Sequence, residues 1–179
     1  MNFELKIMKD LFGKAILDYQ TNNSPEDLIT ETTISEEDEM SVAYLFRSYK
    51  EMPFLEQKAM QLTHGKTLDV GCGAGSHSLY LQNEKKLNVH SIDISPSAIK
   101  ACQLRGVKNA LIQNVLEIDS SNPENKFDTI LLLMNGTGIF GSLKKSSLFF
   151  LVTSLVFKRL LDALSRPSTE RRVLSFLIV

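Results

Sequence analysis

The pattern of apolar and polar positions changes near residue 64. Before that point, apolar residues recur at helical spacing, which predicts helices over about residues 2–19, from near Ser35 onward, and after Pro53. Two serine-led acidic runs, 24–27 and 35–38, are typical of helix caps with their first turns. We therefore expect residues 1–63 to be largely helical.

After His64, short apolar segments alternate with helical ones. Strands are expected over 66–70, 89–93, 110–113 and 127–134, with helices that start at Ser76 and at Ser95. The run 127–134 is almost continuously apolar, which is typical of a strand buried on both faces. This alternation predicts an α/β domain with a doubly wound, mostly parallel sheet over residues 64–179, within a single structural domain overall.

A glycine-rich turn, Gly71-Cys72-Gly73-Ala74-Gly75, follows the first of these strands. Glycines let the chain turn sharply and let a ligand lie against bare backbone. The N–H groups at the start of the next helix then face that ligand. Asp93 ends the second strand, close to the ~20-residue offset at which an acidic residue binds ribose hydroxyls. We therefore expect a ligand that contains a ribose at the carboxyl ends of these strands.

This pattern resembles the class I S-adenosylmethionine-dependent methyltransferases, which have a Rossmann-like fold. The family motif is acid-x-Gly-x-Gly-x-Gly, and every fixed position is matched, by Asp69, Gly71, Gly73 and Gly75. Asp93 matches the acidic residue at the end of the second strand. The resemblance implies that Asp93 binds the ribose hydroxyls, that Ile94 lies against the adenine, and that the glycines approach the methionine part and the ribose.

Further positions of the site follow from the same resemblance, which covers roughly residues 44–141. Asn114 would lie near the adenine amine, and Asn135 would border cofactor and substrate. Tyr44 and Arg47 belong to a stretch that looks like the N-terminal lid of one branch of these enzymes, so residues 1–63 are expected to be a helical lid segment. Arg47 would pair with the methionine carboxylate, because a guanidinium suits carboxylate recognition.

Several of these residues also have a structural interpretation, which the sequence leaves open. Asp69 could tie down its own loop, Asn135 could be a turn former before Gly136, and Tyr44 and Arg47 could serve packing alone. The sequence assigns no catalytic residue and no metal ligands. A general base is optional here, because the methyl of a sulfonium is already activated and positioning supplies much of the rate.

The predicted function is therefore methyl transfer from S-adenosylmethionine to a small-molecule acceptor by in-line displacement. A nicotinamide-dependent oxidoreductase is a weaker alternative, since its Gly-x-Gly-x-x-Gly/Ala fingerprint would place its third glycine at Ser76. A phosphate-binding P-loop is excluded, because no Gly-Lys-Ser/Thr follows the glycines.

The residues after Gly141 leave a third alternative open. They suffice for one helix over 146–165 and one strand over 173–179, whereas the family typically has three strands after the fourth. We therefore expect the C-terminal strands to be incomplete, as in a shortened chain or a tail read in a changed frame. Such a chain could be a non-catalytic remnant that binds the cofactor. An open sheet edge is usually covered by pairing, so we also expect a homo-oligomer.

Composition and charge limit the classes of protein to which this chain could belong. The chain has 179 residues, 43% of them hydrophobic and 23% charged, with a net charge of −1, which indicates one globular domain and no general attraction for nucleic acid. Acidic residues concentrate within 15–46 and basic ones after 144, which we interpret as solvated surface. Two cysteines, no apolar leader and no apolar run near ~20 residues predict a cytoplasmic protein without a membrane span.

Overall fold

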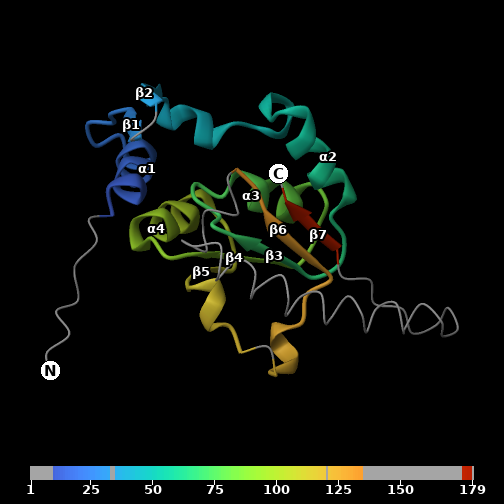
Figure 1. The fold of residues 1–179 in the computed structure, drawn as a ribbon. Coiled ribbons are helices and arrows are strands. Elements are labelled where there is room, and N and C mark those ends of the chain that lie inside the picture. Colours follow the sequence, from blue (N-terminus) through green and yellow to red (C-terminus); the bar gives the residue numbers. More distant parts are fainter. Residues whose placement is uncertain (1–9, 33–34, 120, 135–174, 179) are drawn as a thin grey trace, which may run out of the picture.

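The structure, a computed structural model, describes residues 10–32, 35–119, 121–134 and 175–178. Its centre is a five-stranded sheet with the strand order β5-β4-β3-β6-β7, and all neighbouring strands run parallel (Figure 1). The strands are β3 (Thr67–Val70), β4 (Val89–Asp93), β5 (Ala110–Ile112), β6 (Thr129–Leu132) and β7 (Ser175–Ile178). This confirms the predicted α/β, Rossmann-like sheet, including a C-terminal strand within 173–179.

The central strand β3 is buried along its whole length, and it pairs with β4 on one side and β6 on the other. Its side chains contribute to one apolar cluster through Leu68 and Val70, which pack with Ile92 and Leu132. A second cluster includes Val89 and Leu131 and is completed by residues of the preceding helices. The sheet thus supplies the core, and its strand ends lie in fixed positions.

The helices α3 (Ser76–Asn83) and α4 (Pro96–Arg105) follow β3 and β4 and begin where the sequence predicts. The Ser95 side chain caps α4 by accepting a hydrogen bond from the Ala98 N–H at 2.9 Å, and Pro96 occupies the first turn. Gly106 ends the helix in the left-handed conformation. Local capping chemistry therefore sets both ends of α4.

The helix α1 (Leu11–Thr21) lies against α4. Asp10 caps α1 by accepting from the Gly13 N–H at 3.1 Å, and its other oxygen accepts from the Ser95 hydroxyl at 2.8 Å and the Ser97 N–H at 3.2 Å. A Cβ on Gly13 would lie 1.8 Å from the Ser95 hydroxyl oxygen, so the close approach of the two helices requires a glycine. The predicted helix over 2–19 is confirmed from Leu11 onward, and residues 1–9 lie outside the described residues.

A β-hairpin replaces the helix predicted from Ser35, and this prediction was wrong. Strands β1 (Leu28–Thr32) and β2 (Ser35–Met40) pair antiparallel, with Leu28 opposite Met40. Acidic residues at i, i+3 along 36–39 repel each other in a helix, and the β-branched residues of β1 favour a strand. Nor do residues 24–27 begin a helix. The Asp27 carboxylate instead accepts from the Val42 N–H at 2.8 Å and the Ser41 hydroxyl at 3.2 Å, beyond the hairpin.

Short 3₁₀ turns, η1 (Val42–Phe46) and η2 (Tyr49–Glu51), lead to α2 (Phe54–Leu62), the helix predicted after Pro53. Ala59 and Met60 of α2 pack into the core beside Leu81 and Leu131. Two further 3₁₀ turns, η3 (Val115–Glu117) and η4 (Pro123–Asn125), link β5 to β6. The helix predicted over 146–165 lies outside the described residues.

Candidate cofactor-binding site

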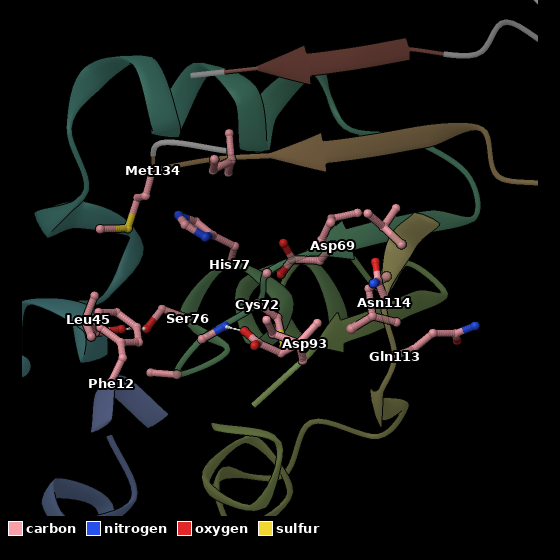
Figure 2. Close-up of a pocket in the computed structure, with 18 of the residues that line it drawn as sticks. Phe12, Leu45, Asp69, Cys72, Ser76, His77, Asp93, Gln113, Asn114 and Met134 are labelled. Atoms are coloured by element: carbon pink, nitrogen blue, oxygen red, sulfur yellow. Dashed lines mark hydrogen bonds between the residues drawn. The ribbon is translucent and has the colours of Figure 1, made fainter. Parts of the chain in front are cut away.

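A cavity of about 540 Å³ opens at the carboxyl ends of β3, β4, β5 and β6 (Figure 2). The chain passes from β3 to β4 and β5, which lie on one side of β3, and then crosses to β6, which lies on its other side. The cavity therefore lies where the strand order reverses. Among the predicted site residues, those that line it are Arg47, Asp69, Gly71, Gly73, Asp93, Ile94 and Asn114. The tertiary structure thus brings most of them together at the place where α/β sheets bind ligands.

The glycine loop forms the floor of the cavity by turning back over β4. The N–H groups of Gly71 and Cys72 both donate to the Ile92 carbonyl, at 2.8 and 3.1 Å. Gly71 and Gly73 have positive φ angles of 71° and 52°, which favour glycine. A Cβ on Gly73 would have only Ile16 Cδ1 near it, at 3.9 Å, so its backbone faces open space.

Gly75 has a different surrounding from the other two glycines. It does not line the cavity and stands at the N-terminus of α3 with φ 78°. A Cβ there would lie 2.8 Å from Cys102 Sγ and 2.9 Å from Val107 Cγ2. Gly75 therefore allows the loop to pack closely on α4 and its following turn.

Asp93 ends β4, and both of its carboxylate oxygens accept hydrogen bonds from backbone N–H groups. One oxygen accepts from the Gly73 N–H at 3.0 Å (Figure 2). The other accepts from the Ser95 N–H, also at 3.0 Å. Each oxygen keeps a further lone pair for a ligand hydroxyl. The neighbouring Ile94 side chain is 61% exposed and forms an apolar surface beside the carboxylate.

Asp69 is a buried carboxyl group on the cavity wall, tied to α3. Its Oδ2 atom accepts from the Ser78 hydroxyl at 2.5 Å, and Ser78 in turn lies 2.7 Å from the Ser91 hydroxyl of β4. Burial raises the pKa of Asp69, although the nearby His77 and the Ser78 bond act in the opposite direction. Asp69 is thus tied to α3 and also lines the cavity, so a structural role and a ligand-binding role do not exclude each other.

Arg47 reaches the cavity from the N-terminal segment, just after η1. Its guanidinium donates to the Tyr44 carbonyl at 2.7 Å and to Glu56 of α2, and it lies 3.2 Å from the Met134 sulfur. The ring of Tyr44 lies 4.1 Å from the guanidinium carbon, but Tyr44 itself does not line the cavity. The Nε atom of Arg47 is buried and has no hydrogen-bond partner in the described part of the chain.

His77 and Glu56 are functional candidates that the sequence did not indicate. His77 lines the cavity at the start of α3, and its Nε2 atom lies 2.8 Å from the same Glu56 oxygen that accepts from Arg47. Burial on its own raises the pKa of Glu56, but the hydrogen bonds from His77 and Arg47 outweigh this, so the pKa is lowered. No local signal relates the three residues, because they come from three separate elements.

The end of β5 contributes the polar residues Gln113 and Asn114 to the cavity (Figure 2). The Asn114 side chain accepts from the Leu116 N–H at 3.0 Å and so caps η3, which leaves its amide group available to a ligand. Gln113 was not predicted, and its position directly before Asn114 is the signal that could have indicated it. Asn135 lies outside the described residues, whereas its neighbour Met134 lines the cavity.

Within the described ranges there is no cluster of histidine, cysteine and acidic residues that could hold a metal ion. The helices of those same ranges are too short or too polar to cross a membrane.

Comparisons with known proteins agree with this geometry. Residues 62–145 match the family model described as a methyltransferase domain. The chain is similar to a SAM-dependent methyltransferase from Bacteroides fragilis solved in complex with S-adenosyl-L-homocysteine, with 37% identity and a TM-score of 0.71. That alignment covers 93% of this chain and 61% of the other. No curated protein matches the chain.

Two further solved structures are similar over smaller parts, and their TM-scores are too low to add to the argument. One concerns the conversion of a disulfide bond into a thioacetal group during echinomycin biosynthesis, with 30% identity, a TM-score of 0.35, and coverage of 42% of this chain and 32% of that chain. The other is the sugar N-methyltransferase KedS8 from Streptoalloteichus, with 15% identity, a TM-score of 0.43, and coverage of 66% and 50%.

The fold, the loop geometry and these matches define the class: residues 62–145 match a methyltransferase domain, and the chain is similar to a SAM-dependent methyltransferase with a Rossmann-like sheet. The chain spans 61% of the length of the Bacteroides fragilis protein.

Proposed function

We propose that this chain binds S-adenosylmethionine in the cavity and transfers its methyl group to a small-molecule acceptor. The observation that carries the proposal is the Asp93 carboxylate, which holds the Gly73 N–H at the mouth of β4 and keeps lone pairs free beside the exposed Ile94. A carboxylate with free lone pairs can accept hydrogen bonds from the hydroxyls of a ribose, and an exposed apolar side chain can pack against an adenine ring.

The residues around the cavity fit the rest of this cofactor. Gly71 and Gly73 line the cavity, and the open space at Gly73 supports a close approach of the ribose and the methionine part. Asn114 also lines the cavity, and we propose that it binds the adenine amine. The Nε of Arg47, which is buried and has no hydrogen-bond partner among the described residues, supports its proposed pairing with the methionine carboxylate. Tyr44 would act through the guanidinium that it covers, and Gly75 through the packing of the loop.

The cofactor, when bound, supplies a methyl group that is already activated on a sulfonium. The chain's own residues bind and orient the two reactants in line, and the N-terminal segment restricts water. We propose residues 1–63 as a lid over residues 64–179. This is supported by the Ser76 hydroxyl, which donates to the Leu45 carbonyl at 2.7 Å, and by Arg47, which contacts Met134.

Calorimetric titration with S-adenosylhomocysteine and with NAD tests the cofactor assignment. We expect binding of the first and none of the second. Asp93→Ala should weaken S-adenosylhomocysteine binding by about 1.5–3 kcal/mol, the scale of lost charged hydrogen bonds. Asp18→Ala is the matched control, because the Asp18 carboxylate accepts from Asn23 at the surface and does not line the cavity. Unchanged affinity in Asp93→Ala would refute the ribose contact.

Methyl transfer needs a separate experiment. The chain is incubated with S-adenosylmethionine and a pool of small hydroxyl, thiol and amine compounds, and the formation of S-adenosylhomocysteine is followed. We expect product above the level given by Asp93→Ala. Tight cofactor binding with no product from any acceptor would favour the non-catalytic alternative.

The proposed setting is a cytoplasmic protein that forms homo-oligomers. Cys72 and Cys102 are both free, with their sulfur atoms 3.8 Å apart, which supports a reducing compartment. Strand β7 ends the strand order of the described sheet, so its outer edge could pair with a second copy. Light scattering coupled to size exclusion tests this, and a monomer at all concentrations would refute it.

A further inference from the structure

Glu56 is a buried carboxylate on the lid helix α2, and it faces the cavity wall rather than solvent. The residue is 4% exposed, and one of its oxygens, Oε2, accepts from Arg47 on one side and lies 2.8 Å from His77 Nε2 on the other. Arg47 and His77 themselves are 7% and 8% exposed, and both line the cavity. A single carboxylate oxygen therefore joins the N-terminal segment to the first turn of α3.

Packing alone gives no reason for this arrangement. Removing a carboxylate and a guanidinium from water is costly, and apolar side chains of similar size often stabilise a fold at least as well. What a buried ion pair does provide is a fixed position for each partner. The hydrogen bonds from His77 and Arg47 outweigh the effect of burial and lower the pKa of Glu56, so the group stays charged.

The guanidinium of Arg47 is held from several sides but is not saturated. One NH₂ group donates to the Tyr44 carbonyl, the other meets Glu56 and the Met134 sulfur, and the Tyr44 ring covers one face. The Nε–H has no acceptor in the described part of the chain, although Arg47 is more than nine-tenths buried. A buried donor without a partner is unfavourable, and a carboxylate from a ligand is the acceptor that a guanidinium edge binds best.

We propose that Glu56 is the positioning residue of a subsite, formed with Arg47 and His77, that recognises the amino-acid end of the cofactor. Glu56 does not itself need to touch the ligand. It fixes the guanidinium, which lies 3.2 Å from the Met134 sulfur, and the His77 imidazole. His77 lies on the Met134 side of the cavity, away from Gln113 and Asn114 at the end of β5 (Figure 2). The subsite rests on the proposed function, since it assumes a ligand that carries both an adenosyl group and an amino-acid end.

A brace that only holds the lid in place would have the same contacts, so the test must separate the two roles. S-adenosylhomocysteine and 5′-methylthioadenosine share the adenosyl thioether, but only the first carries the amino-acid end. A loosened lid would weaken both ligands alike. Loss of the positioned donors would weaken S-adenosylhomocysteine selectively.

The experiment is calorimetric titration of the full chain with both ligands, for the unaltered protein, for Glu56→Gln and for Glu51→Gln. Glu56→Gln keeps the size of the side chain and removes its charge, and should weaken S-adenosylhomocysteine about tenfold while 5′-methylthioadenosine changes less than about twofold. Glu51→Gln is the matched control, since Glu51 is an exposed capping residue of η2 and glutamine serves that role too. It should leave both affinities unchanged.

Equal weakening of both ligands by Glu56→Gln, or no weakening of S-adenosylhomocysteine, would overturn the subsite. Should Glu56→Gln not fold, as judged by its thermal transition, Arg47→Lys replaces it, because lysine keeps the charge and loses the guanidinium fork. The same selective loss is expected there, and equal loss again overturns the proposal. If the unaltered protein binds neither ligand, the proposed function fails. If it binds both equally tightly, only the subsite fails.

Discussion

The two walls of the cavity are built from different parts of the polypeptide. The sheet-side wall is mainly backbone, with the glycine loop over Ile92 and the Asp93 carboxylate that accepts from the Gly73 and Ser95 N–H groups. The N-terminal wall is mainly side chain, with Arg47 of the N-terminal segment joined through Glu56 of α2 to His77 of α3. The shape of a wall made of backbone depends on φ angles and on the close approach of neighbouring chain segments. The shape of a wall made of side chains depends on how the elements that carry those side chains are anchored.

This difference predicts that the sheet-side wall is the more sensitive to a single added methyl group. Gly75→Ala should lower the free energy of unfolding by about 2–4 kcal/mol, from the positive φ and from overlap of the new Cβ with the adjoining chain. That overlap follows from the 2.8 Å distance to Cys102 Sγ and 2.9 Å distance to Val107 Cγ2. Urea denaturation measures the change.

Gly106→Ala is the control for the backbone effect alone. Gly106 also has a positive φ, 91°, but a Cβ there would meet nothing within 4 Å. Gly106→Ala should lower the free energy of unfolding by about 1 kcal/mol. Equal losses in the two variants would mean that close packing of the loop on α4 does not constrain this wall.

The N-terminal wall should depend on the anchoring of α2 by Lys85. The Lys85 ammonium donates to the carbonyls of Met60 and Gln61, each at 2.8 Å, and to that of Thr63, at the C-terminal end of α2. These carbonyls have no partner within the helix, and the charge also suits the helix dipole. Lys85→Met should lower the free energy of unfolding by about 1–2 kcal/mol.

Urea denaturation of Lys85→Met is compared with that of Lys86→Met, whose lysine is exposed. The control should change the free energy of unfolding little. A larger loss in Lys86→Met than in Lys85→Met would argue against this anchor and against the dependence of the side-chain wall on it.

The smallest expected effect concerns the titration of Asp69, which lies between the two walls. Burial raises the pKa of Asp69 above its ordinary value of 3.8, so the folded state favours the protonated form. Its contribution to stability is therefore fully present below pH 3.8 and is lost as the pH rises through the higher folded-state value. Asp69→Asn should remove this loss, because asparagine still accepts from Ser78 but does not ionise.

The free energy of unfolding of both proteins is measured from pH 4 upward. The advantage of Asp69→Asn should grow as the pH rises and then become constant. An advantage that does not change with pH would show that the carboxyl has the same pKa in the folded and unfolded states.

The strands, the loop and α4 could be predicted because their signals are local in sequence. Glycine at 71 and 73, the Ser95-Pro96 cap and the apolar run at β6 each specify a conformation within a few residues. The hairpin of β1 and β2 could not be predicted, because its cap-like serines and acidic residues suit more than one local structure. There, cross-strand pairing and the Asp27 contact with Val42 decided the outcome.

What the sequence by itself determined is the sheet, its glycine loop and the carboxylate at Asp93, since each follows from neighbouring residues and their backbone preferences. Only the tertiary structure decided that Glu56 joins Arg47 to His77, and that Gly75 faces α4 rather than the cavity. Such contacts form between elements that meet only after the chain has folded, and burial there fixes charges and close approaches that no local pattern encodes.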